Sequence, residues 1–118
     1  MKKIEAIIRK TKFEEVKDAL KNVGIGFFSY WEVRGIGKSR QERAFRGIVY
    51  DTSAIERIKM SIVVREKNVQ STINAIMESG RTGDVGDGKI FVINVEESYR
   101  IRTGETGDES LYIKGEED

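Results

Sequence analysis

A glycine-rich segment near residue 85 holds the residues best suited to chemistry. Gly83-Asp84-Val85-Gly86-Asp87-Gly88-Lys89 places three glycines ahead of one lysine. Glycines let a backbone approach a polyphosphate closely and point N–H groups at it, and a lysine adds a positive point charge. The spacing is that of a phosphate loop, but Ile90 stands where the Mg²⁺-binding hydroxyl belongs. The segment is therefore either an anion-binding loop or a plain glycine-rich turn between a helix and a strand.

Two arginines further along favour the anion-binding interpretation. Arg100 and Arg102 stand at alternate positions, and alternate side chains of an extended segment project to the same side. A guanidinium group holds phosphate oxygens through two parallel hydrogen bonds. We therefore expect Lys89, Arg100 and Arg102 to converge with the glycine loop on one polyphosphate. A second segment, Gly37-Lys38-Ser39, has the end of a phosphate-loop motif, but Glu32 occupies the position of its first glycine.

The composition argues against several classes of enzyme. The chain of 118 residues has no histidine, no cysteine and a net charge of +1. The commonest general base, the commonest metal ligand and the thiol nucleophile are therefore missing. A charge this small gives no overall field to attract nucleic acid or lipid. With no signal-peptide pattern and no long apolar run, we expect a cytoplasmic, non-catalytic protein without direct membrane insertion.

The first half of the chain reads as a strand, a helix and a second strand. Lys2 to Arg9 alternates apolar and polar residues, which indicates a half-buried strand. A helix follows, with a capping box at Thr11 and Glu14 and a stop at Gly24. Aromatic and β-branched residues predict the second strand over residues 26–36.

The second half repeats this order. Alternation around 58–64 predicts a third strand. The apolar spacing from Val69 to Met77 predicts a helix that ends near Gly80, and Val69 and Met77 are expected to face inward. Ile90 to Val95 reads as a buried fourth strand. The order strand, helix, strand, strand, helix, strand is that of a ferredoxin-like α+β fold in one domain.

Two segments lack regular periodicity. The stretch from Lys38 to Ser53 joins two strands with about sixteen residues, far more than a hairpin needs, and such loops usually carry function. A disordered insertion is the alternative. The tail from Thr103 to Asp118 has six acidic residues and one lysine. We expect a short strand at 111–113 or, failing that, a mobile tail.

Several of these motifs together resemble the PII signal-transduction family. Residues 81–92, from Arg81-Thr82-Gly83 to Ile90-Phe91-Val92, resemble its C-terminal signature. Val95-Glu96-Glu97 and Ile101-Arg102-Thr103-Gly104-Glu105 continue that likeness. The opening Met1-Lys2-Lys3-Ile4-Glu5-Ala6-Ile7-Ile8 and the segment Glu32-Val33-Arg34-Gly35-Ile36-Gly37 are also similar. The resemblance covers residues 1 to about 106 and suggests a divergent member.

This resemblance implies a homotrimer of ferredoxin-like subunits, each a single domain over residues 1–118. Its parts would be a T-loop at about 37–54, a B-loop at about 81–89 and a C-terminal segment at about 98–118. ATP or ADP, with Mg²⁺ accompanying ATP, would bind in clefts between subunits. Around the phosphates the resemblance places Gly37, Lys38, Gly86, Asp87, Gly88, Lys89, Arg100 and Arg102. The rest of the cleft would be lined by Ile7, Phe28, Ser29, Gly35, Ile36, Val63 and Val85.

The resemblance also implies a protein partner, such as an ammonium transporter or an enzyme of nitrogen metabolism, docked by the T-loop. Tyr50 stands where some members carry a modified tyrosine; an ordinary partner-contacting aromatic is the alternative. Binding of 2-oxoglutarate would involve Ser39, Gln41 and Arg57, although the family has a glutamine at the first and a lysine at the third. Arg9-Lys10-Thr11 lacks the family's usual proline.

The main hypothesis is a non-catalytic sensor whose nucleotide changes the order of the T-loop. Within the family, the alternative is a nitrogenase-regulating or divergent paralogue with an altered effector response. A slow ATPase would need Asp87 or a T-loop carboxylate to orient water without histidine, cysteine or a complete phosphate loop. A nucleic-acid binder would use Phe27, Phe28, Tyr30 and Trp31 as stacking platforms, but packing is the simpler role for these aromatics, so no nucleic-acid partner is expected.

Overall fold

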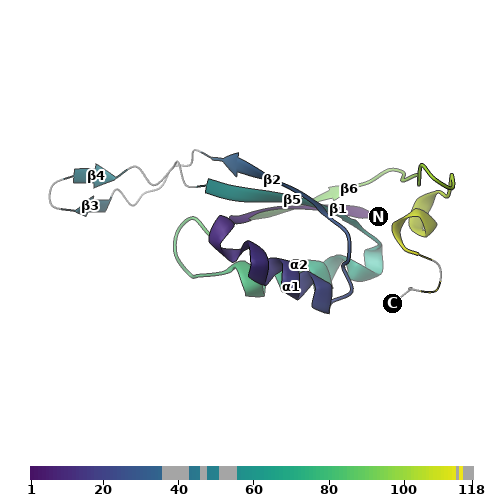
Figure 1. Cartoon of the computed structure of the whole chain (residues 1–118), viewed down its shortest axis with the longest axis horizontal. Coiled ribbons are helices and arrows are strands. Elements are labelled where there is room, and N and C mark those ends of the chain that lie inside the picture. The colour runs from purple at the N-terminus through teal and green to yellow at the C-terminus, as the bar shows by residue number, and fades with distance from the viewer. Residues whose placement is uncertain (36–42, 46–47, 51–55, 114, 116–118) are drawn as a thin grey trace.

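The protein was analysed as a computed structural model, which describes residues 1–35, 43–45, 48–50, 56–113 and 115. A four-stranded antiparallel sheet has the order β2-β5-β1-β6, with two helices on one of its faces (Figure 1). The strands are β1 (Lys2–Arg9), β2 (Ser29–Arg34), β5 (Glu56–Val64) and β6 (Gly88–Asn94), and the helices are α1 (Phe13–Asn22) and α2 (Val69–Gly80). The predicted ferredoxin-like α+β order is confirmed.

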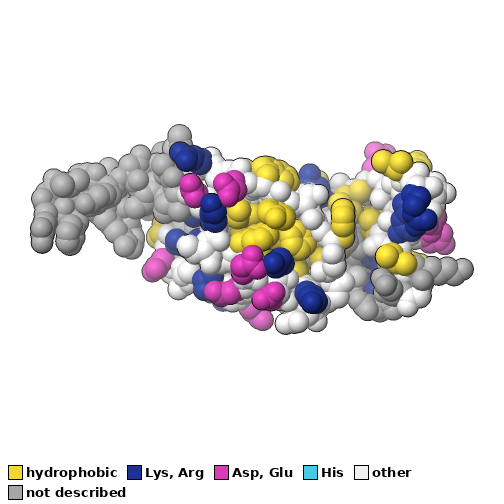
Figure 2. Space-filling model, in the orientation of Figure 1, with side chains coloured by type: hydrophobic (Ala, Val, Ile, Leu, Met, Phe, Trp, Pro, Cys, Tyr) yellow, Lys and Arg dark blue, Asp and Glu magenta, His cyan; other side chains and the backbone are white. Residues whose placement is uncertain are grey.

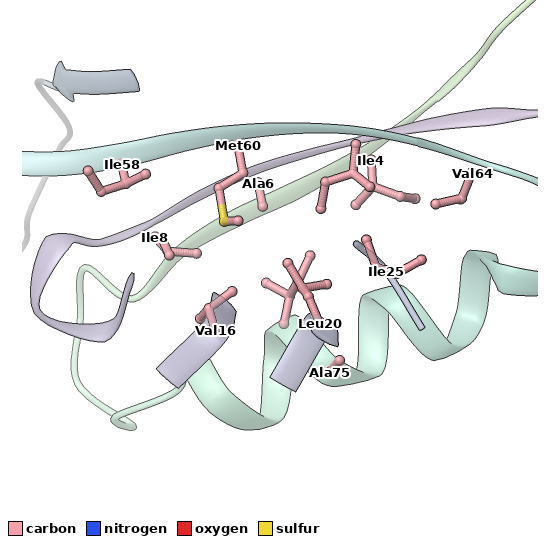
Figure 3. Packing of buried hydrophobic residues seen from close by; sticks show 12 residues of the cluster. Ile4, Ala6, Ile8, Val16, Leu20, Ile25, Ile58, Met60, Val64 and Ala75 are labelled. Atoms are coloured by element: carbon pink, nitrogen blue, oxygen red, sulfur yellow. The ribbon is translucent and has the colours of Figure 1, made fainter. Parts of the chain in front are cut away.

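The core lies between the helices and one face of the sheet. Ile4, Ala6 and Ile8 alternate along β1, and each is at most 3% exposed (Figure 3). They pack with residues of β5 against Val16 and Leu20 of α1, both of which are fully buried. The two-residue period of β1 and the helical period of α1 thus meet on a single apolar layer.

The start of α1 differs from the prediction. A short 3₁₀ turn, η1 (Lys10–Lys12), follows β1 directly, and α1 begins at Phe13 with Lys12 as its N-cap. No side chain caps this helix, so the predicted capping box is wrong. Because the chain turns as soon as it leaves the sheet, Thr11 lies inside the 3₁₀ turn and too early to cap α1.

The fourth strand is an edge strand rather than a buried one. Among the described strands, β6 pairs with β1 alone, and Phe91, Val92 and Ile93 are 46%, 47% and 42% exposed. The prediction of a buried strand was wrong on both faces. Phe91 and Ile93 lie on the face that no described helix covers, and Val92, which pairs with Ile4 on the helix side, is exposed because β6 is at the edge of the sheet. Met77 of α2, predicted to face inward, is also 39% exposed at the flank of this strand.

Two segments without clear periodicity contain defined structure. β3 (Arg43–Phe45) and β4 (Ile48–Tyr50) pair antiparallel inside the predicted T-loop. In the tail, the strand expected at 111–113 is absent, and its first residue, Leu111, ends a 3₁₀ turn, η4 (Gly107–Leu111). Gly107 begins this turn at φ 65°, a conformation that favours glycine and leads the chain away from an extended path.

The second face of the sheet has no helix on it among the described residues. In the register of the sheet, Ile7, Val63 and Phe91 lie on this open face, and the last two are 37% and 46% exposed. Lys59 and Glu5 form an ion pair of 2.9 Å at its centre. Figure 2, which views the sheet edge-on, shows further hydrophobic side chains at the side of the molecule near its middle. The sheet therefore presents a mixed apolar and charged surface opposite its core.

Candidate functional site

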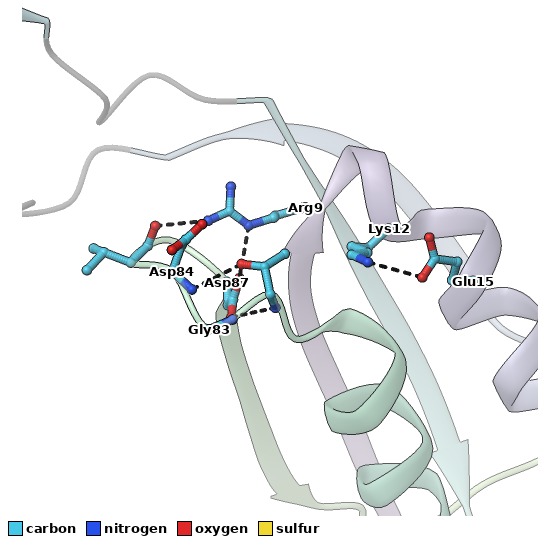
Figure 4. A network of polar contacts seen from close by, with 8 residues as sticks. Arg9, Lys12, Glu15, Gly83, Asp84 and Asp87 are labelled. Atoms are coloured by element: carbon cyan, nitrogen blue, oxygen red, sulfur yellow. Dashed lines mark hydrogen bonds and ion pairs between the residues drawn. The ribbon is translucent and has the colours of Figure 1, made fainter. Parts of the chain in front are cut away.

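The B-loop is closed by one carboxylate. The Oδ2 atom of Asp87 accepts hydrogen bonds from the backbone N–H groups of Thr82 and Gly83, both at 2.9 Å. Its Oδ1 atom accepts bonds from the Thr82 hydroxyl and from Nε of Arg9, the latter at 3.0 Å (Figure 4). The Thr82 hydroxyl is the main cause that holds the pKa of the Asp87 carboxyl far below its usual range, with Arg9 and the two amides adding to it.

These contacts give Asp87 a different role from the one expected. Both carboxylate oxygens are engaged inside the loop, and a carboxylate repels phosphate. Asp87 therefore shapes the loop, and the backbone around Val85 and Gly86 remains as the part that can meet a ligand. Arg9 reinforces this shape because its Nη2 atom donates a 2.9 Å hydrogen bond to the Val85 carbonyl.

The glycine at the start of β6 is required by close packing. A Cβ atom on Gly88 would lie 1.7 Å from the carbonyl oxygen of Ile7, and its φ of 105° also excludes most other residues. The next residue, Lys89, pairs with Ile7 in the sheet and lies on the open face. The B-loop thus leads directly into the sheet and places Lys89 beside Ile7.

A pair of arginines lies under this loop. Arg9 and Arg57 are register partners on β1 and β5, and a Cβ on Gly86 would be 3.0 Å from Nη2 of Arg57 and 3.4 Å from that of Arg9. Nη1 of Arg57 is buried and has no hydrogen-bond partner among the described residues. Burial, and then the charge of Arg9, lower the pKa of the Arg57 guanidinium. An unpaired buried donor next to a second cation suits an anion.

The structure does not bring all the predicted phosphate ligands together in one chain. Lys89 lies near one end of β6, whereas Arg100 and Arg102 follow its other end, so the expected convergence does not occur within a subunit (Figure 1). The two arginines are also not on an extended segment. Residues 101–103 form a turn, which the Gly104 N–H closes by donating to the Arg100 carbonyl at 2.8 Å.

The described site residues instead fall into two groups at opposite ends of the sheet. Val63 pairs with Lys3, which is four residues before Ile7 on β1, or about 13 Å along the strand. We call the first group the loop half-site and the second the arginine half-site. The loop half-site comprises Ile7, Gly35, Val85, Gly86, Asp87, Gly88 and Lys89, and the arginine half-site comprises Phe28, Ser29, Val63, Arg100 and Arg102.

Some of the predicted site residues have another structural role, and others lie outside the described residues. The Phe28 ring packs against Phe13 with a centroid distance of 6.4 Å and against Tyr30 at 6.1 Å, so this ring serves the core. For Tyr50 only the backbone, in β4, is described. The remaining candidates lie outside the described residues: Ile36, Gly37, Lys38, Ser39 and Gln41.

Two residues of the site escaped the sequence analysis. Arg9 was noted only because the family's proline is missing next to it, and Thr82 only as part of the signature. The alternation of β1 does place Arg9 on the same face as Ile7, which was the available signal. No sequence pattern shows that the Thr82 hydroxyl turns back to Asp87.

The fold and the site define a ferredoxin-like α+β protein with a glycine loop locked against one end of its sheet. Comparison with known sequences agrees with that class. The sequence model of the family described as "Nitrogen regulatory protein P-II" matches residues 1–105. The chain belongs to this family, whose members are signal-transduction regulators.

Curated relatives come from bacteria and archaea. A nitrogen regulatory protein P-II of Rhizobium meliloti is 44% identical over 112 residues, which cover 94% of this chain and all of that protein. One of Pasteurella multocida is 45% identical over the same shares. Nitrogen regulatory protein P-II 1 of Methanothermobacter thermautotrophicus is 45% identical, with 94% of this chain and 97% of that protein covered. Neither described helix is long and apolar enough to cross a membrane.

Proposed function

We propose that this chain is a nucleotide-sensing regulator that binds ATP or ADP between the subunits of a homotrimer. The observation that carries the proposal is the division of the site into a loop half-site and an arginine half-site at opposite ends of one open sheet face. Neither half is a complete polyphosphate site. In a cyclic trimer each interface joins one patch of a subunit to a different patch of its neighbour, so the two halves can meet there.

The open face supplies a surface for that association. Phe91 and Ile93 of β6 and Trp31 of β2 are 42–46% exposed on it, although large apolar residues are usually covered in a soluble protein. The central ion pair between Glu5 and Lys59 would then be enclosed, and Lys59 already lies 5.4 Å from the centre of the Trp31 ring. Both charges are thus paired before association, which lowers the cost of burying them.

The residues present suit a nucleotide. Lys89 and the arginines carry positive charge, and the B-loop exposes backbone that a phosphate can approach. The unpaired Nη1 of Arg57 further supports a carboxylate effector, such as 2-oxoglutarate, beside the nucleotide. The occupant would bias the T-loop, through which the protein would dock an ammonium transporter or an enzyme of nitrogen metabolism. This requires different affinities for the two T-loop states, about 1.4 kcal/mol for each tenfold shift.

Calorimetric titration of the full chain with ADP and with ATP, in the presence and absence of 2-oxoglutarate, tests the binding. We expect saturable binding of at least one nucleotide. Lys89→Gln and Arg102→Gln should each weaken it, because each removes a cation from a different half-site. Absence of ATP and ADP binding by the unaltered protein would refute the proposal.

Mixing the two variants tests whether the cleft is shared. An Arg102→Gln subunit keeps an intact loop half-site, and a Lys89→Gln subunit keeps an intact arginine half-site. When the two variants assemble at random into trimers, these intact halves face each other in about a quarter of the clefts. Co-refolded material should therefore recover tight binding in about that fraction. If the mixture binds no better than either variant alone, both halves come from one subunit and the shared cleft is wrong.

A further inference from the structure

The C-terminal segment already binds Arg100, one of the two arginines assigned to the arginine half-site. Nη1 of Arg100 donates to Oε1 of Glu105 at 2.9 Å, and Nη2 donates to the backbone carbonyls of Tyr112 at 2.6 Å and Ser110 at 3.3 Å. The Arg100 side chain is only 21% exposed. Glu105 thus balances the charge of Arg100, and both Nη atoms of its guanidinium already donate hydrogen bonds within the chain.

The segment that supplies these acceptors is itself anchored. The Tyr112 ring packs on the Arg65 guanidinium, which lies 4.3 Å from the ring centre. The hydroxyl of Ser110 bonds that of Ser98 at 2.7 Å, and the N–H of Gly107 donates to the Ser98 carbonyl at 2.9 Å. These contacts fasten residues 105–112 to Arg65, directly after β5, and to Ser98, which follows β6.

Glu105 adds a charge that acts on the same arginine. Its carboxylate accepts from the Thr103 hydroxyl at 2.7 Å, and this bond, then the charge of Arg100, holds the pKa of Glu105 below its usual value. A deprotonated carboxylate on Arg100 is the same kind of hydrogen-bonded anionic partner that a phosphate oxygen would be. Arg102, by contrast, is exposed on the turn.

From these contacts we propose that residues 105–112 form an intramolecular latch that competes with nucleotide phosphate for Arg100. The proposal rests on the nucleotide binding proposed above. A guanidinium that donates to Glu105, Ser110 and Tyr112 cannot also give two forked bonds to a phosphate. Nucleotide binding and latch docking therefore oppose each other, and either one loosens the other.

Removing the Tyr112 anchor tests this competition. Tyr112→Ala deletes the ring that packs on Arg65 but keeps the backbone. Loss of a cation–π contact of this kind corresponds to a change in affinity of about two- to fivefold. The ADP dissociation constant should therefore fall by about that factor. Arg65→Gln removes the same contact from the other side and should act alike. Ile113→Ala, which alters an exposed neighbour on the same segment, should leave ADP binding unchanged.

Hydrogen exchange supplies a second measurement on the unaltered protein. Amides of residues 105–112 should exchange faster when ADP saturates the site, because the latch is displaced. Equal or weaker ADP binding by Tyr112→Ala and Arg65→Gln, or slower exchange with ADP, would overturn the latch while the nucleotide site stands. If the unaltered protein and both variants all fail to bind ADP and ATP, the nucleotide function and the latch fall together. Binding by the variants alone would support the latch.

Discussion

Replacing Asp87 by asparagine should open the B-loop without disturbing the core. Its two oxygens accept four hydrogen bonds, from the Thr82 N–H and hydroxyl, the Gly83 N–H and Arg9. An asparagine NH₂ group cannot accept, so one side of this arrangement is lost whichever way the amide turns. Two lost bonds to a side chain that is 25% exposed correspond to about 2 kcal/mol of unfolding free energy.

The pH dependence gives this prediction a sign. The pKa of Asp87 is lowered in the folded protein, so its contribution to stability is fully present above the unfolded pKa of about 4. That contribution is lost as the pH falls below this value and through the folded pKa. The difference in unfolding free energy between the unaltered protein and Asp87→Asn should thus be constant near pH 7 and should shrink below about pH 4.

Urea unfolding at several pH values and hydrogen exchange of residues 81–89 measure these effects. Asp84→Asn is the matched control, because it removes the same charge from the same loop and leaves the four bonds in place. Unchanged exchange at Thr82 and Gly83 in Asp87→Asn would show that the carboxylate does not hold the loop. A stability gap that grows in acid would contradict the assigned pKa direction.

Three further substitutions probe other parts of the structure. Gly88→Ala should lower the unfolding free energy by about 3 kcal/mol or more, because the new Cβ would meet the Ile7 carbonyl. At Gly83 a Cβ would have no neighbouring atom within 4 Å, so Gly83→Ala should cost only about 1–2 kcal/mol of backbone strain. Thermal melts would compare the two variants. Arg57→Met should raise the unfolding free energy by about 1 kcal/mol while weakening any 2-oxoglutarate binding, since it removes a buried unpaired donor. Phe91→Asp should convert the proposed homotrimer to monomer in light scattering, and a trimer that persists would exclude the open face as its interface.

The sequence predicted the elements well where periodicity is strong. β1, β5 and α2 have clear two-residue or helical patterns, and each forms at the expected place. The register that puts Ile7 and Lys89 side by side follows from alternation plus the antiparallel order. Failures occurred where a property depends on neighbours distant in sequence. Exposure of β6 is one, because an apolar run does not reveal how many elements cover it.

The arrangement of the site was harder to predict than its composition. The cations were identified, but a single chain does not bring them together, because β6 separates Lys89 from Arg100. The turn at residues 101–103 arises from contacts with Glu105 and Gly104, which alternation alone does not indicate. The role of Asp87 also depends on a bend that returns it to Thr82. Long-range and loop-internal hydrogen bonds are thus the part of this molecule that local pattern misses.

In the proposed trimer, the four-residue interval between Lys3 and Ile7 would set the distance between the two half-sites of each chain. Because β1 is hydrogen-bonded on both sides, to β5 and to β6, each chain carries its two half-sites at a fixed spacing. Lengthening β1 and its partners by two residues would keep the inward and outward alternation, yet displace one pocket by about 7 Å. Each subunit would still fold, but its neighbours' halves would no longer be opposite one another. In the proposed trimer, the length of β1 is therefore constrained by the assembly as well as by the fold of one subunit.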